Sequence, residues 1–126
     1  MRIYKLKALA RFQRRERVSD STLVRAIERM EQGLVDADLG GGLVKQRIAR
    51  PGQGKSGGFR TIIAYRHGKR AVFLFGFAKN ERANLDDDEL VYWQRIGKVY
   101  LGLDDDGVAL AIAAEELMEI PYGEEP

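Results

Sequence analysis

Apolar and polar residues alternate between positions 43 and 78, and this alternation predicts three consecutive β-strands. In the strand predicted at residues 59–66, successive side chains leave on opposite faces, so that one face carries Phe59, Thr61, Ile63 and Tyr65 and the other carries Arg60, Ile62, Ala64 and Arg66. The short polar turn of His67, Gly68 and Lys69 then joins this strand to the apolar run at 71–78. The pattern predicts an antiparallel hairpin with cationic ends.

Apolar residues at helical spacing predict two helices before these strands and two after them. The first covers residues 6–17 with arginines on its outer side, and the second begins at Ser19 to Ser21 and ends near Gly33. After the hairpin, the acidic triplets 86–88 and 104–106 each precede a helical pattern and are predicted to cap it, the last helix extending to Leu117. Residues 2–5 fit either a first strand or the lead into a helix, and a short strand is possible at each end.

This order predicts an α+β fold with helices packed on an antiparallel sheet. The length of 126 residues suits one domain that buries a core without disulfide or metal cross-links. The absence of cysteine excludes disulfides, thiolate zinc sites and cysteine nucleophiles, and it fits a reducing compartment. The sequence has no run of apolar residues long enough to span a bilayer, and its first residues lack the apolar core of a signal peptide, so we expect a cytoplasmic protein without a membrane partner.

The net charge of +2 conceals two segments of opposite sign. Residues 1–82 hold 19 Lys and Arg against 7 Asp and Glu, whereas residues 83–126 hold 2 against 12. Such asymmetry favours a body that faces nucleic acid and an acidic segment that covers the basic surface or repels wrong ligands. The simpler alternative is that interleaved surface charges only keep the domain in solution.

Several catalytic systems fail for lack of the residues they need. His67 is the single histidine, lies in a predicted turn and has no clear nucleophile beside it, and one histidine without cysteine makes zinc improbable. The segment around Lys55 lacks the glycine spacing of a phosphate-binding loop and leads into a strand instead of a helix. The acidic triplets lack the spacing of a calcium-binding loop, so we expect neither a metal nor another cofactor.

Catalysis by positioned cations remains, and it suits RNA cleavage. Attack of a ribose 2′-hydroxyl on the adjacent phosphate builds negative charge, which arginine and lysine stabilise. Five cations lie on or beside the predicted strands, namely Lys45, Arg47, Lys55, Arg60 and Lys79, and Glu81 is the only nearby carboxylate. Further candidates for RNA contact are Arg50, Arg82 and Phe77. Phe59, Tyr65 and Phe75 also offer stacking surface for bases. Together with Phe77 they make four aromatic rings, of which we expect three to be in the core.

Two segments, LGGGLVKQRIARPGQGKSGGFRTIIAY and FLFGFAKNERANL, resemble the RelE/HigB-type toxins of type II toxin–antitoxin systems. The resemblance covers about residues 39–90. It implies two N-terminal helices packed on a small curved antiparallel sheet, with residues 1–98 as the toxin domain and residues 99–126 as an acidic helical extension of it. It also implies a toxin that cleaves mRNA in the ribosomal A site without metal and is held inactive by a cognate antitoxin.

The resemblance implies roles for individual residues. Lys45 and Lys55 would contact or activate the substrate phosphate, Arg60 would stabilise the transition state, and Lys79 would join them. Two departures from the family pattern are Asn80, in place of a second arginine, and Asp86, near the position of a catalytic tyrosine. The proton-transfer group therefore stays open between Tyr92, Glu81 and a lysine.

Three functions follow from these observations. The first is a ribosome-dependent mRNA endoribonuclease toxin. The second is a non-catalytic nucleic-acid-binding or regulatory domain on the same fold, and the third is a gyrase-poisoning relative, against which the density of cations on the central strands argues. The acidic segment at 103–126 is expected to pack beside the basic sheet or to form a homodimer contact.

Overall fold

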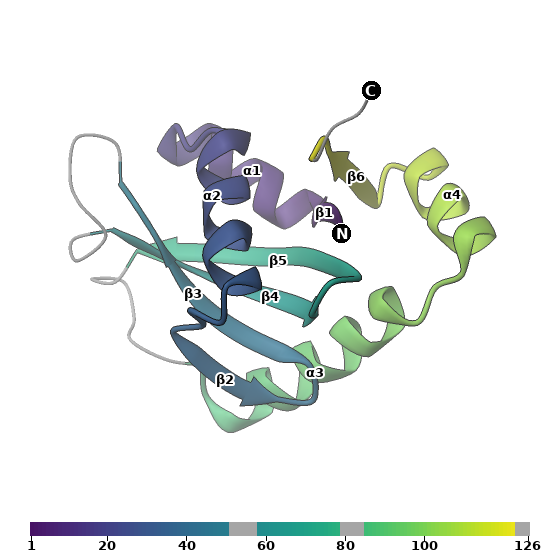
Figure 1. The fold of residues 1–126 in the computed structure, drawn as a ribbon. Coiled ribbons are helices and arrows are strands. Elements are labelled where there is room, and N and C mark those ends of the chain that lie inside the picture. Colours follow the sequence, from purple (N-terminus) through teal and green to yellow (C-terminus); the bar gives the residue numbers. More distant parts are fainter. Residues whose placement is uncertain (51–57, 79–84, 123–126) are drawn as a thin grey trace.

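The computed structural model describes residues 1–50, 58–78 and 85–122. Within these residues the chain folds into a six-stranded mixed sheet with helices on both faces (Figure 1). The strand order across the sheet is β2-β3-β4-β5-β1-β6. In chain order the elements are β1 (Arg2–Leu6), α1 (Lys7–Glu16), α2 (Asp20–Glu31), β2 (Ala37–Gly40), β3 (Leu43–Ile48), β4 (Phe59–Arg66), β5 (Arg70–Ala78), α3 (Asp87–Leu101), α4 (Asp105–Ala113) and β6 (Leu117–Ile120).

The α+β class and the three consecutive strands β3, β4 and β5 are confirmed. The expectation that two helices open the chain and pack on a purely antiparallel sheet was wrong. Strand β1 comes first and lies parallel to β5, with Tyr4 opposite Val72, while its other edge pairs antiparallel with β6. The alternative of a first strand at residues 2–5 is the correct one, and a short strand also lies near the other end. The pairing of β1 was not predicted, because its partner strands lie far along the chain.

Two apolar layers cover the two faces of the sheet. Helices α1 and α2 lie on one face, where Leu9, Phe12 and Ile27 pack against Phe59 and Ile63 of β4. Helices α3 and α4 supply the second layer against Ile62, Ala64 and other residues of the opposite face. The predicted division of β4 into two faces is therefore confirmed. In the described part of the chain, no helix is long and apolar enough to cross a membrane.

Side-chain caps fix where three of the helices begin. Ser19 accepts a hydrogen bond from the backbone N–H of Thr22, and Asp104 accepts one from Gly107. Asp86 and Glu89 form a reciprocal capping box at the start of α3. Capping by the two acidic triplets is thus confirmed, but Leu117 was wrongly expected in the last helix, since α4 ends at Ala113 and Leu117 lies in β6.

A polar contact joins the end of α2 to the β4–β5 turn. Glu31 accepts hydrogen bonds from the Tyr65 hydroxyl and, at 3.0 Å, from the Gly68 backbone N–H. Burial alone would raise the pKa of Glu31, but these hydrogen bonds and the nearby His67 outweigh it and hold that pKa below its ordinary value of 4.5. Burial, followed by the bond to Glu31, raises the pKa of the Tyr65 hydroxyl.

Replacing Tyr65 by phenylalanine is expected to lower the free energy of unfolding by about 2 kcal/mol at neutral pH, because a hydrogen bond to a charged, half-buried carboxylate is lost. A group with a lowered folded-state pKa stabilises the fold above its unfolded pKa and loses that contribution as the pH falls through the folded-state value. The difference between wild type and Tyr65→Phe should therefore shrink below pH 4.5 in urea titrations. Tyr122→Phe, at an exposed tyrosine, is the control. If Tyr65→Phe loses as much free energy of unfolding at acid pH as at neutral pH, the role of Glu31 is contradicted.

Candidate nucleic-acid interface

Three of the predicted site residues lie together on the sheet face that α3 packs against. Lys45 and Arg47 are two residues apart on β3, and Arg47 is directly opposite Arg60 on β4. Together with β5, these strands form two rows of side chains across the sheet. One row holds Arg47, Arg60 and Phe77, and the neighbouring row holds Lys45, Ile62 and Phe75. The period of two along each strand and the register between strands thus bring the three cations to one surface.

Arg60 has the most unusual environment of the three. Its side chain is half-buried, and its Nη1 atom is buried and has no hydrogen-bond partner among the described residues. A buried donor without a partner costs free energy, and like charges on directly opposed strand positions repel. An anion placed between Arg60 and Arg47 would remove both penalties at once.

Arg47 is held by an acidic neighbour that the sequence patterns did not identify. Asp36 accepts a hydrogen bond from the Arg47 backbone N–H at 2.7 Å and lies 3.3 Å from the Nη2 atom of the side chain. Burial alone would raise the pKa of Asp36, but the Arg47 hydrogen bonds and the charges of Arg47 and Arg29 hold it below its usual value. Since Asp36 offsets the charge of Arg47, Arg60 is the cation of this pair that is left to receive an anion.

Lys45 lies beside a small cavity of about 220 Å³ that Leu39, Leu85 and Leu90 also line. Its side chain is half-buried. Apolar walls around an ammonium group strengthen its attraction for a phosphate, because little water is present to screen the charge. Lys45 is therefore positioned as a second anion contact near Arg60.

A β-bulge decides which aromatic rings accompany these cations. Ile62 and Ile63 are opposite Phe75 and Phe73, so Leu74 is the extra residue in β5. As a result Phe73 faces α1 and α2, whereas Phe75 and Phe77 face α3. Phe59 and Tyr65 belong to the α1 and α2 side, so the four aromatic residues do not form one stacking surface.

The ring of Phe77 is 5% exposed, so in this conformation it offers little surface to a base. A chain of ring contacts runs from it to the protein surface. Phe77 lies 6.0 Å from Phe75, Phe75 lies 4.7 Å from Trp93, and Trp93 lies 5.0 Å from Tyr92. Tyr92 is 55% exposed and is the outermost ring of this chain.

The remaining site predictions fall elsewhere. Arg50 lies 5.3 Å from the ring of Phe59, which belongs to the opposite face, so the structure separates Arg50 from the other cations. Lys55, Lys79, Glu81 and Arg82 lie outside the described residues. Among the described residues, no three His, Cys, Asp or Glu side chains gather in a way that would hold a metal ion.

Gly58 allows the close approach of strands that positions Arg60. A Cβ atom at Gly58 would lie 2.1 Å from the carbonyl oxygen of Ile48, at the end of β3. On the sheet face that α3 covers, a Cβ atom at Gly97 of α3 would lie 3.1 Å from that of Ala64. Close packing therefore requires a glycine at position 58, whereas at position 97 an added Cβ would need Ala64 to move by a few tenths of an ångström; neither close approach is visible in the hydrophobic pattern.

A search of curated protein sequences found no match to the chain. A family model, described as the RelE toxin of the RelE/RelB toxin–antitoxin system, matches residues 1–120. This match spans both apolar layers, all six strands and the cationic rows on β3 and β4. The chain therefore belongs to the RelE toxin family.

Proposed function

We propose that this toxin is a ribosome-dependent endoribonuclease that cleaves mRNA without a metal ion and so inhibits translation in the cytoplasm. The observation that carries the proposal is the buried Nη1 atom of Arg60, which has no hydrogen-bond partner in the described part of the chain and lies in a row with Arg47, next to the row of Lys45. Membership of the RelE family implies a cognate antitoxin as partner.

In the proposed reaction, the 2′-oxygen of a ribose attacks the adjacent phosphorus. A bond forms between these atoms, the bond from phosphorus to the 5′-oxygen breaks, and the 2′-hydroxyl proton is in effect transferred to the leaving oxygen. The products are a 2′,3′-cyclic phosphate and a 5′-hydroxyl. Arg60 would donate two parallel hydrogen bonds to the phosphate oxygens as negative charge builds on them, and Lys45 would stabilise the same charge. Lys55 and Lys79 are proposed to complete this set of cations.

The proton-transfer group is proposed among Glu81, Tyr92 and a lysine. Tyr92 has the support of position, because its exposed ring ends the chain of aromatic contacts that starts beside Arg60 at Phe77. A tyrosine hydroxyl can donate a proton to the leaving oxygen and can accept one in return.

One observation favours a second function, which is nucleic-acid binding without cleavage. Asp86 lies near the position where the family pattern has a catalytic tyrosine, and its side chain caps α3 by accepting a hydrogen bond from the Glu89 backbone N–H at 2.8 Å. Asp86 thus has a capping role here and does not supply the phenolic hydroxyl of the family pattern. If no other group replaces the tyrosine, the cations would bind RNA without turning it over.

Induced expression of the wild type and of an Arg60→Ala, Lys79→Ala variant separates the two functions. We expect growth arrest and codon-phased breaks in translated messages with the wild type only, measured by primer extension. Lys69→Ala, at an exposed turn lysine on the other end of the hairpin, is the control and should cleave like the wild type. Unchanged growth and intact mRNA with the wild type would contradict cleavage and leave the binding function.

A further inference from the structure

Helix α4 is strongly apolar, yet most of its surface is exposed. Of its nine residues only Val108 and Ala111 are buried, and Leu110 is 71% exposed. In Figure 1, α4 lies at one end of the molecule beside β6 and is open on its outer side. Helices that are apolar on nearly all sides are usually covered by other protein, so the outer side of α4 calls for a partner.

A groove of about 450 Å³ lies between the end of α3 and α4. Its walls are mostly apolar, and Val99, a wall residue on α3, is 55% exposed. The groove continues onto the exposed alanines of α4 at helical spacing from Leu110. Together these residues form one apolar surface, the α3–α4 face, made of Val99, Leu103, Ala109, Leu110, Ala113 and Ala114.

Hydrogen bonds hold the two helices that form this groove. The Nη1 atom of Arg70 donates to the carbonyl oxygens of Tyr100 at 2.9 Å and Leu103 at 2.8 Å, where α3 ends. The Tyr100 hydroxyl donates to Oε1 of Glu116 at 3.1 Å and so ties the segment after α4 to α3. Because the walls are held before any partner arrives, little conformational entropy is lost on binding.

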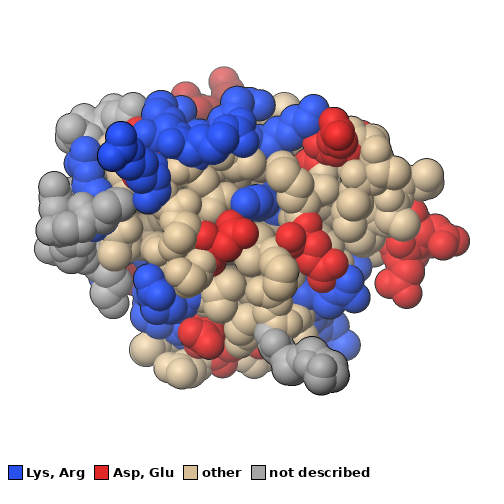
Figure 2. Space-filling view, turned by 90° about the horizontal axis from the view of Figure 1, so that it is seen from above, with Lys and Arg blue, Asp and Glu red and all other residues tan. Residues whose placement is uncertain are grey.

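Charges of opposite sign border the α3–α4 face. On α3, the exposed Arg95 lies one helical turn before Val99, and the exposed Lys98 is next to it. On α4, the exposed Asp105 and Asp106 precede Ala109 and Leu110 by one turn. None of these four charged residues forms an ion pair with another described residue. Figure 2 shows this end of the molecule as mostly uncharged surface with acidic side chains at its margin.

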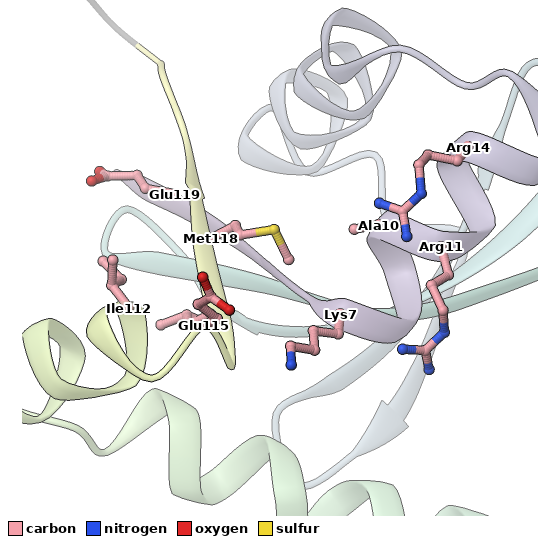
Figure 3. Close-up of a pocket in the computed structure, with 9 residues that line it drawn as sticks. Lys7, Ala10, Arg11, Arg14, Ile112, Glu115, Met118 and Glu119 are labelled. Carbon is pink, nitrogen blue, oxygen red and sulfur yellow. The ribbon is translucent and has the colours of Figure 1, made fainter.

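The side of α4 that faces α1 has a different character. Ile112 and Glu115 lie there, across a second groove from Lys7 and Arg11 (Figure 3). Charged side chains stand on both sides of that groove, so it does not continue the apolar surface. The α3–α4 face is therefore limited to the outer side of α4 and its groove with α3.

We propose that the α3–α4 face is a homodimer interface, in which Leu110 of each copy enters the groove of the other. A two-fold axis brings one patch against itself, so each cationic border meets an acidic border. The acidic start of α4 would then lie beside Arg95 and Lys98 of the second copy, and the same contact would occur twice. A partner with one sign of charge would be repelled by one border of the face, whereas a second copy matches both. The inference does not depend on whether the toxin cleaves RNA.

The test is sedimentation equilibrium of the full chain from micromolar to submillimolar concentrations. We expect a monomer–dimer equilibrium for the wild type. Leu110→Glu should raise the dissociation constant at least about 100-fold, because it would place a carboxylate in each apolar groove. Leu34→Glu makes the same change at another apolar residue that is 57% exposed, and this control should dimerise like the wild type.

A charge swap tests the pairing of the borders. Lys98→Glu and Asp106→Lys should each raise the dissociation constant about 10-fold, because like charges then face each other. The double variant reverses both signs and should dimerise nearly as well as the wild type. Urea unfolding of each variant separates loss of the dimer from loss of the fold.

Three outcomes would overturn the proposal. A wild type that stays monomeric at the highest concentration would exclude the second copy, and if Leu110→Glu then prevents the complex with the cognate antitoxin, the face belongs to that partner. Equal weakening by Leu34→Glu would show general apolar association. A charge-swap variant that dimerises no better than the single variants would show that the two borders do not meet.

Discussion

Replacement of Arg60 by alanine is expected to reduce the rate of mRNA cleavage on ribosomes by about 10²- to 10³-fold, the usual loss when one positioned donor to a developing negative charge is removed. The fold should not suffer. Nη1 of Arg60 makes no hydrogen bond with any residue in the ranges 1–50, 58–78 and 85–122, and the side chain lies opposite the like-charged Arg47, so the free energy of unfolding should stay equal or rise by a few tenths of a kcal/mol. Single-turnover cleavage and urea unfolding of the same preparation measure both effects.

Arg60→Lys sharpens this prediction. It keeps the charge but loses the planar pair of donors, so the rate should fall between those of the wild type and Arg60→Ala. Lys69→Ala at the turn should leave the rate unchanged. If Arg60→Ala cleaves as fast as the wild type while remaining folded, the proposed role of the guanidinium is wrong.

Gly58→Ala is expected to have the largest effect on stability, a loss of about 3 kcal/mol or more in the free energy of unfolding. The added Cβ would lie 2.1 Å from the Ile48 carbonyl oxygen, and a backbone neighbour can give way only if β3 and β4 separate. Urea denaturation measures the change. Arg60 is two residues away, so cleavage should be lost together with stability.

Two other glycines give a graded comparison for Gly58. At Gly76 a Cβ would lie 2.8 Å from the Phe12 ring, a side chain that can shift, so Gly76→Ala should cost about 1–2 kcal/mol. At Gly68 nothing lies within 4 Å, but φ is +70°, so Gly68→Ala should cost about 1 kcal/mol through backbone strain. An effect at Gly58 no larger than that at Gly68 would contradict the close packing of β3 and β4.

Local patterns were sufficient for the elements whose signal lies within a few residues. Period-two alternation identified β3 and β4, and side-chain caps marked the starts of α2, α3 and α4. Strand β2 went unpredicted because its four residues include Asp38 and Gly40 and show no apolar alternation. The parallel pairing of β1 with β5 also went unpredicted, since it depends on contacts between residues nearly 70 positions apart.

The same distinction explains which parts of the site were found. Lys45, Arg47 and Arg60 share a face because each strand repeats every two residues, and that much can be read from the sequence. By the same period Arg50 shares a face with Val44 and Ile48. Its separation from Arg47 could therefore have been predicted. The burial of the Arg60 Nη1 atom and the Asp36 contact arise from tertiary packing and have no local signal.

The interior position of β1 has a consequence for biosynthesis. Residues 2–6 are translated before β5 and β6, yet they lie between β5, which ends at residue 78, and β6, which ends at residue 120. Neither edge of β1 can pair until those segments have left the ribosome. Pairings so distant along the chain also fold slowly, because a large loop must close before any contact is gained. The sheet is thus completed only after residue 120 has been synthesised. This delays the appearance of a folded toxin beside the ribosome that makes it.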